Sequence, residues 1–268
     1  MRDAPNTGVK QCISCGVVTH TNDLSTLVNY EHSSMWDWLS NSLDDLPPPQ
    51  NDVERRVKAL NIQTKDDKGS SLLDVGCGGG EMLMALSEDF EVFGIEPEKS
   101  MREKLIRNGF KCWESSVEPI NLKLKFNVIT LFHVIEHIYN PFEILKSCFD
   151  LLEQGGRIYI ETPNADDALL TTYKCEAFEN FTYWSHHPML HTNESLSACL
   201  EKVGFKVEYT RGVQRYSLSN HIFWLTSGKP GGHEVLKELF SKETLEKYDS
   251  DLISQRKNDT IWIVAKKC

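Results

Sequence analysis

Residues 72–80, Leu-Leu-Asp-Val-Gly-Cys-Gly-Gly-Gly, constrain the fold of this chain more than any other stretch. An apolar run ends in glycines, and Glu-Met-Leu-Met-Ala-Leu follows at once with helical spacing. The pattern predicts a buried strand, a tight turn and a helix. Such a turn presents backbone N–H groups at a helix start beside the carboxyl end of a strand, which predicts binding of a nucleotide-like or carboxylate-bearing ligand.

Strand and helix patterns alternate through the rest of the chain. Buried-strand runs occur at 72–75, 91–95, 110–113, 126–131, 157–160, 205–209 and 260–265. One helix is expected to begin near residue 53, and another, after the second strand, to end near residue 108. Further helices are expected at 81–87, 141–153 and 194–202. This alternation predicts an α/β fold, a doubly wound, Rossmann-like parallel sheet with helices on both faces.

Composition limits the partners of the chain. Its 268 residues are 40% hydrophobic and carry a net charge of −10. Because binding to a phosphate backbone requires a dense basic face, nucleic acid is not an expected partner. No apolar run approaches the ~20 residues that span a bilayer and the N-terminus lacks a signal-peptide core, so we expect a cytoplasmic protein without membrane contact. Its eight cysteines lack the spacing of a disulfide scaffold and are expected to be reduced.

Two segments lie outside the alternating pattern. Pro47-Pro48-Pro49 is the expected boundary between an N-terminal arm, residues 1–50, and the main domain, residues 51–268. Residues 212–258 form an insertion between the last two strands, with a polar helix expected at 233–248. We interpret the arm and the insertion as a cap. An edge-covering subdomain or a homodimer contact is an open alternative for the insertion.

The arm contains a cysteine pair at metal-ligand spacing. Cys12 and Cys15 are followed by Gly16, which allows a turn that points both sulfurs at one zinc ion. A structural zinc site needs four ligands, and the nearest further candidates are His20 and His32. Two interpretations are open: a partial zinc site, or two ordinary thiols.

The details of the glycine turn discriminate between ligand classes. Its glycines are Gly76, Gly78 and Gly80, and Glu81 stands where the dinucleotide fingerprint requires glycine. Asp74 ends the strand before the turn, and its carboxylate favours a cationic ligand over a pyrophosphate. S-adenosylmethionine carries a sulfonium and an ammonium group. These features favour it over a nicotinamide dinucleotide.

Residues 74–80 and 92–96 resemble motifs I and II of class I S-adenosylmethionine-dependent methyltransferases. Glu96, about 20 residues beyond the turn, fits a residue that accepts both ribose hydroxyls. Residues 126–138, with the run Val134-x-Glu136-His137, resemble the fourth-strand segment of ubiquinone-biosynthesis-type O-methyltransferases. The arm resembles the second half of a zinc module found ahead of some sugar methyltransferases.

The resemblance implies the strand order 3-2-1-4-5-7-6 and S-adenosylmethionine as cofactor. The resemblance of the arm adds zinc, with Cys12 and Cys15 as ligands, as a second cofactor to be tested. The implied cofactor contacts come from the glycine turn, the ends of the second and fourth strands, and the segment after the third: Asp74, Gly76, Cys77, Gly78, Gly80, Glu96, Pro97, Ser116, Val117, Phe132 and His133.

Methylation of a hydroxyl requires alignment of the acceptor and removal of a proton. The expected catalytic residues are the candidate bases on loops at carboxyl ends of strands, His187, His137 and Glu136. A metal site formed by His186, His187 and His191 is disfavoured because no carboxylate or cysteine is near them in sequence. The aromatic and hydrogen-bonding residues of the loops, the arm and the insertion are the expected substrate contacts: Tyr30, Tyr183, His186, His191, Arg215, Tyr216 and His221.

The sequence therefore predicts methyl transfer to a small acceptor, at the oxygen of a sugar or glycan precursor. N-methylation of a small phosphorylated amine is an alternative reaction. A nicotinamide-dependent oxidoreductase and a noncatalytic cofactor-binding interaction protein are the alternatives from other functional classes.

Overall fold

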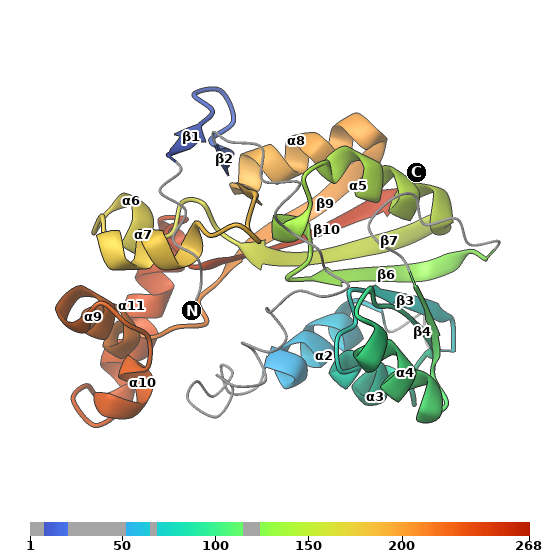
Figure 1. The fold of residues 1–268 in the computed structure, drawn as a ribbon, viewed down its shortest axis with the longest axis horizontal. Helices are drawn as coiled ribbons and strands as arrows, with labels where there is room; N and C mark the ends of the chain where they lie inside the picture. Colours follow the sequence, from blue (N-terminus) through green and yellow to red (C-terminus); the bar gives the residue numbers. More distant parts are fainter. Residues whose placement is uncertain (1–7, 21–51, 65–68, 115–123) are drawn as a thin grey trace.

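The computed structural model describes residues 8–20, 52–64, 69–114 and 124–268, and its centre is a seven-stranded sheet (Figure 1). The strand order is β5-β4-β3-β6-β7-β10-β9, which confirms the order 3-2-1-4-5-7-6 expected from the resemblance. The first five strands pair in parallel, whereas β10 is antiparallel to both β7 and β9. The strands of this sheet are β3 (Ser71–Val75), β4 (Glu91–Ile95), β5 (Lys111–Trp113), β6 (Phe126–Phe132), β7 (Leu152–Pro163), β9 (Phe205–Val213) and β10 (Thr260–Lys267).

Helices cover both faces of the sheet, as the alternating pattern predicts. Figure 1 shows α2 (Asp52–Gln63), α3 (Glu81–Leu86) and α4 (Lys99–Arg107) on one side, and α5 (Pro141–Leu151) and α8 (Asn193–Val203) on the other. Successive side chains of β3 explain this arrangement, because Leu72 packs in the cluster with Leu60 of α2 while Leu73 packs with Leu145 of α5. Both faces of β3 are therefore buried.

Strand β7 is much longer than the sequence pattern indicates. The pattern places the strand at 157–160 and has Gly155 and Gly156 end the preceding helix, but α5 ends at Leu151 and β7 begins at the next residue. The glycines lie inside the strand, where the pairing with β6 shifts register and Gly155 has a φ of 83°. Glycine marks a bulge here, because it adopts the left-handed conformation without steric strain.

The loops beyond the sheet contain more regular structure than the sequence indicates. Between β7 and α8 lie α6 (Ala168–Thr171), α7 (Glu176–Thr182) and β8 (Met189–Leu190), where we expected a loop. Between β9 and β10 the structure places α9 (Leu218–Ser227), α10 (Gly232–Val235) and α11 (Lys242–Ser254), where one polar helix was expected. Gly228 and Gly231, both with positive φ, end one helix and begin the next.

The N-terminal segment pairs with the main sheet's loop region. Strands β1 (Val9–Gln11) and β2 (Val18–His20) form an antiparallel hairpin, and β2 pairs with β8 through Val18 and Leu190. Buried Val18, Ala165 and Leu190 pack together beneath this small sheet. The proline boundary at 47–49 and Tyr30 lie outside the described residues, so the division at residue 50 stays a prediction.

Across the helices that the structure describes, none combines the length and apolar character needed to cross a bilayer. Figure 1 shows α6, α7, α9, α10 and α11 gathered beyond the end of β7, at one end of the molecule. Helices at this end extend past the carboxyl ends of the parallel strands, which is where a doubly wound sheet binds its ligands.

Trp262→Ala tests the core on the α2 face of the sheet. Trp262 of β10 is 0% exposed and lies with its ring centroid 5.4 Å from that of Phe132 and 6.3 Å from that of Tyr159. Because the substitution leaves a large cavity, we expect the free energy of unfolding to fall by about 3–5 kcal/mol, measured by urea denaturation. Lys266→Ala, on the same strand and partly exposed, is the control and should change stability by less than about 0.5 kcal/mol. A similar loss in both variants would contradict this account of the core.

Candidate functional site

The glycine turn between β3 and α3 has the tight geometry that the sequence predicts. Gly76, Gly78 and Gly80 have φ values of 72°, 52° and 84°. A Cβ at Gly76 would lie 2.5 Å from Val134, and one at Gly80 would lie 2.2 Å from Leu105. A Cβ at Gly78 would meet no atom within 4 Å. Packing thus requires glycine at positions 76 and 80. At position 78, only the backbone conformation and an approaching ligand would require glycine.

Glu96 joins this turn to the loop after β4. Its Oε2 accepts the backbone N–H of Gly78 at 2.8 Å, and its Oε1 accepts that of Glu98 at 2.8 Å. Arg102 donates to the backbone oxygens of Glu96 and Pro97 at 2.8 and 2.9 Å. Burial raises the pKa of Glu96, although both backbone N–H groups act in the opposite direction. The predicted residues Gly78, Glu96 and Pro97 therefore lie together.

Asp74 lies under the turn in the interior of β3. It is 3% exposed, and Thr130 of β6 donates its hydroxyl to Asp74 Oδ1 at 2.6 Å. Burial raises the pKa of Asp74 to about 7, and the Thr130 hydrogen bond only partly offsets this. No basic side chain is among the hydrogen-bond partners found for Asp74 in the described residues. The carboxylate is thus poorly compensated and would gain from a nearby cation.

Cys77 is the predicted turn residue whose side chain points into the protein. Its Sγ lies 3.9 Å from Sγ of Cys112 on β5, and both thiols are buried. The Cys77 sulfur therefore faces the interior, and its backbone N–H donates to Ile95 O at 3.0 Å. Ser116 and Val117, the predicted contacts after the third strand, lie outside the described residues.

His133 at the end of β6 lies between two buried carboxylates. Its Nδ1 is 3.0 Å from Glu136 Oε1, and its Nε2 is 3.3 Å from Glu161 Oε1. Its φ of 57° is left-handed, which is strained for a residue with a side chain and is typical of functional sites. Phe132, the neighbouring predicted contact, is 8% exposed and stacks on Trp262. His133 thus lies among charged groups, whereas Phe132 packs in the core.

Glu161 and two arginines were missed by the sequence analysis. Glu161 of β7 is 0% exposed and accepts Arg55 at 2.6 and 3.0 Å and Arg56 at 2.6 and 3.0 Å. Burial alone would raise the pKa of Glu161, but His133 and the two guanidinium groups hold it well below its usual value. An acidic residue directly after the apolar run 158–160 was the available signal, the same signal that identified Asp74.

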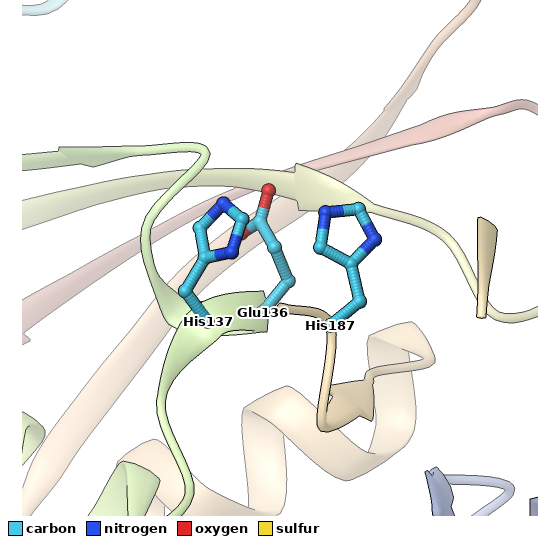
Figure 2. Close-up of side chains that lie close together, drawn as sticks. All are labelled: Glu136, His137 and His187. Atoms are coloured by element: carbon cyan, nitrogen blue, oxygen red, sulfur yellow. The ribbon is translucent and has the colours of Figure 1, made fainter. Parts of the chain in front are cut away.

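Glu136, His137 and His187 form a second cluster (Figure 2), and Glu136 links it to His133. Glu136 and His137 lie on a single helical turn, Ile135–His137, and His187 belongs to the turn before β8. One possible ligand atom of each residue lies within 4.8 Å of those of the others, and the two imidazole centroids are 4.9 Å apart. The three predicted catalytic residues are therefore neighbours, although 50 positions separate His187 from His137.

Hydrogen bonds fix the members of this cluster. Glu136 is 1% exposed and accepts Thr162 Oγ1 at 3.0 Å in addition to His133. Burial alone would raise its pKa, but the His133 hydrogen bond and the charges of His133, His137 and His187 lower the pKa of Glu136 to about 2. The Nδ1 atoms of His137 and His187 lie 2.5 and 2.9 Å from the carbonyl oxygens of His186 and Thr182. Each ring is thereby oriented.

Among the other predicted loop residues, His186 contributes its carbonyl oxygen to this cluster, whereas its ring and the side chain of His191 have other partners. His186 stacks on Trp184 with centroids 4.4 Å apart, and His191 Nδ1 pairs with Ser195 Oγ at 3.1 Å. Burial lowers the pKa of His191 to about 4. Tyr183 is partly buried, and burial raises its pKa. His186 and His187 both contact the ring of Trp184, with centroid distances of 4.4 and 5.6 Å. The carboxylate that is absent from the nearby sequence is supplied by Glu136, which groups with His187 and whose charge also acts on His191.

The predicted residues of the insertion have two different surroundings. Arg215 donates to Asp52 of α2 at 2.5 Å, and Arg55 donates to the same carboxylate at 2.8 Å, which links the insertion to the Glu161 network. The guanidinium carbon of Arg215 lies over the ring of Tyr216, 5.4 Å from the ring centroid. His221 pairs instead with Tyr248 Oη at 2.9 Å, and burial lowers its pKa to about 4. Tyr30 lies outside the described residues.

Cys12 and Cys15 form the tight turn expected from their spacing. Gly16 N–H donates to Cys12 O at 2.9 Å, and Thr192 Oγ1 donates to Cys15 O at 2.7 Å. Backbone N–H groups of Cys15 and Ser14 lower the pKa of the exposed Cys12 thiol. Within the residues that the structure describes, neither cysteine belongs to a group of three possible metal ligands. Zinc binding by Cys12 and Cys15 therefore stays a prediction.

Comparisons with known proteins identify relatives of this fold and sequence. Residues 50–210 match the family model described as a methyltransferase domain. The chain is 32% identical over 118 residues to ubiquinone biosynthesis O-methyltransferase of Haemophilus ducreyi, covering 38% of this chain and 50% of that protein. It is 29% identical over 138 residues to the mitochondrial enzyme of that name from Candida albicans, covering 47% of this chain and 42% of that protein. The chain thus spans about half the length of the curated relatives it matches.

A solved structure shares the fold. The S-adenosylmethionine-dependent methyltransferase of Archaeoglobus fulgidus aligns with a TM-score of 0.53 and 20% identity over 86% of this chain and 99% of that one. At this identity the likeness shows the fold. The family match covers more than half of the whole chain, from the helix before the glycine turn to β9. The chain belongs to the class I S-adenosylmethionine-dependent methyltransferase domain family, as a distant relative of the ubiquinone-biosynthesis O-methyltransferases.

Proposed function

We propose that this chain transfers a methyl group from S-adenosylmethionine to a hydroxyl oxygen of a small acceptor, a sugar or glycan precursor. The hydrogen bond between Gly78 N–H and Glu96 carries the proposal, because it brings the glycine turn and the expected ribose acceptor into one site. When bound, the cofactor supplies an activated methyl group on a sulfonium. The open space at Gly78 and the poorly compensated Asp74 both fit such a ligand.

Residues on the neighbouring strand ends support an acceptor site beside the cofactor. Phe132 pairs with Glu161 across β6 and β7, and Glu136, His137 and His187 lie just beyond these strand ends. We assign activation of the acceptor hydroxyl to these last three residues. Tyr183, His186, His191 and the Arg215–Tyr216 pair would contact the rest of the acceptor.

Transfer of labelled methyl groups tests the reaction directly. The full chain is incubated with methyl-labelled S-adenosylmethionine and separate pools of sugar nucleotides, phosphorylated amino alcohols and phenols. We expect label in a hydroxyl compound, and His187→Ala to lower kcat while affinity for S-adenosylhomocysteine is kept. Label on nitrogen would favour N-methylation. Tight cofactor binding without transfer would favour an interaction protein, and a thermal shift with NAD alone would favour an oxidoreductase.

Gly78→Ala tests whether the turn is the cofactor site. We expect at least about tenfold weaker binding of S-adenosylhomocysteine by calorimetry, because the new methyl group occupies space that the ligand would approach. Gly69→Ala is a matched control, since Gly69 also has a positive φ, 83°, and nothing within 4 Å of its Cβ position. Both variants should lose about 1 kcal/mol of stability from backbone strain. Equal cofactor affinity in the two variants would refute the assignment.

The pH dependence of binding tests the role of Asp74. A cationic ligand prefers the ionised carboxylate, and burial raises the pKa of Asp74 to about 7. The affinity for S-adenosylmethionine, relative to that for S-adenosylhomocysteine, should therefore rise by up to about tenfold per pH unit as the pH increases toward 7. Above that pH the ratio should level off. Asp74→Asn keeps an acceptor for Thr130 and should remove the difference. Parallel pH profiles for both ligands in the original chain would contradict the electrostatic role.

A further inference from the structure

Two buried thiols meet beside the glycine turn. Cys77 of the turn and Cys112 of β5 are 5% and 9% exposed, and their sulfur atoms lie 3.9 Å apart. A Cβ built on Gly94 of β4 would lie 2.6 Å from Cys77 Sγ and 3.3 Å from Cys112 Sγ. Both sulfurs therefore occupy space that this glycine leaves open. The proposed function uses neither sulfur.

The backbones that carry the two thiols are both attached to β4. Cys112 pairs with Gly94 where β5 runs parallel to β4, and Cys77 donates its N–H to Ile95 O at 3.0 Å. A disulfide requires the two sulfurs to approach to about 2.05 Å. Attachment to adjacent residues of one strand holds both backbones beside the same point of the sheet. Rotation of the side chains with a small backbone shift can therefore close the bond.

The contact between the thiols also activates one of them. The hydrogen bond from Cys77 lowers the pKa of the Cys112 thiol, against the effect of burial. The thiolate is the form of cysteine that reacts with a peroxide, and a neighbouring thiol converts the product to a disulfide. Cys112 is therefore the expected first site of oxidation, and Cys77 is the neighbouring thiol.

We propose that Cys77 and Cys112 form a reversible disulfide that weakens cofactor binding at the glycine turn, with hydrogen peroxide as the oxidant. The Cys112 thiolate attacks one peroxide oxygen, the O–O bond breaks, and uptake of one proton gives a sulfenic acid and water. The Cys77 sulfur then attacks the sulfenic sulfur, which forms the S–S bond and releases a second water. Two thiols are thus oxidised by two electrons, and a dithiol reductant restores them.

Closure of the bond acts on the cofactor site through the residue that follows Cys77. The N–H of Gly78 donates to Glu96 Oε2 at 2.8 Å, and left-handed glycines stand on both sides of Cys77. Because glycine backbone rotates with little steric resistance, a pull on the Cys77 side chain moves the Gly78 N–H relative to Glu96. This effect rests on the proposed function, since it needs the cofactor at this turn, whereas the bond itself does not.

Peroxide treatment followed by peptide mapping and calorimetry tests both parts. The full chain carries Cys12→Ser and Cys15→Ser, which removes the thiol pair of the hairpin. We expect mass spectrometry to find a peptide pair linked through Cys77 and Cys112. Affinity for S-adenosylhomocysteine should fall by at least about tenfold, the size expected for losing one hydrogen bond to a charged group. Dithiothreitol should restore it.

The reverse effect of the cofactor on the thiols is a second readout. If the disulfide weakens cofactor binding, the cofactor must favour the dithiol form by the same factor. A tenfold difference in affinity corresponds to about 30 mV for a two-electron couple, so saturating S-adenosylhomocysteine should raise the midpoint potential of the pair by at least about 30 mV. An unchanged potential would overturn the coupling.

Control variants separate this pair from other thiols and from loss of the fold. Cys112→Ala should form no such bond and should keep the same affinity for S-adenosylhomocysteine with and without peroxide. Cys148→Ala, which removes a thiol on α5 that is 0% exposed, should respond to peroxide as the parent chain does. An equal loss of affinity in Cys112→Ala, or a mapped bond without loss of affinity, would overturn the proposal. A reduced chain that binds no S-adenosylhomocysteine would refute the proposed function, while peptide mapping would still decide whether the bond forms.

Discussion

Four carboxylates buried along adjacent strand ends are the constraint on which the rest of the structure depends. Asp74, Glu96, Glu136 and Glu161 are each between 0% and 3% exposed and belong to β3, β7 or the segments that follow β4 and β6. A buried carboxylate is costly unless cations or hydrogen bonds compensate it. The protein compensates the four unequally. The pKa values of Glu136 and Glu161 are lowered, whereas those of Asp74 and Glu96 are raised.

This inequality divides the edge of the sheet into two halves. Helix α2 supplies Arg55 and Arg56 to Glu161, and its Asp52 ties Arg215 of the insertion to the same network. On this side the protein's own charges already balance. On the β3–β4 side, Thr130 and backbone N–H groups are the hydrogen-bond donors to Asp74 and Glu96, and no guanidinium binds either carboxylate among the described residues. A cationic cofactor would therefore gain most where the glycine turn would place it.

The β3–β4 side of the sheet edge is formed by local structure and could be predicted from the sequence. The side around Glu161 could not. Gly76, Gly78, Asp74 and Glu96 act through a strand, a turn and the next strand, so their arrangement follows from residues close in sequence. The pairs Arg55–Glu161 and His137–His187 join segments 106 and 50 residues apart, and periodicity carries no information on such contacts. Proximity in sequence is only a partial guide, because the rings of His186 and His187 share Trp184 whereas His191 pairs with Ser195.

The same division bears on how one fold can serve several acceptors. The turn that faces the donor is fixed by backbone conformation and by the clashes that any side chain at Gly76 or Gly80 would cause. The groups that would activate the acceptor are brought together by the Ile135–His137 turn and the loop before β8, and the hairpin β1–β2 pairs with that loop at Val18 and Leu190. A change in the loop or hairpin could move His187 relative to Glu136 without disturbing Asp74, Gly78 or Glu96. Acceptor choice can thus vary independently of donor binding, because the two depend on different contacts.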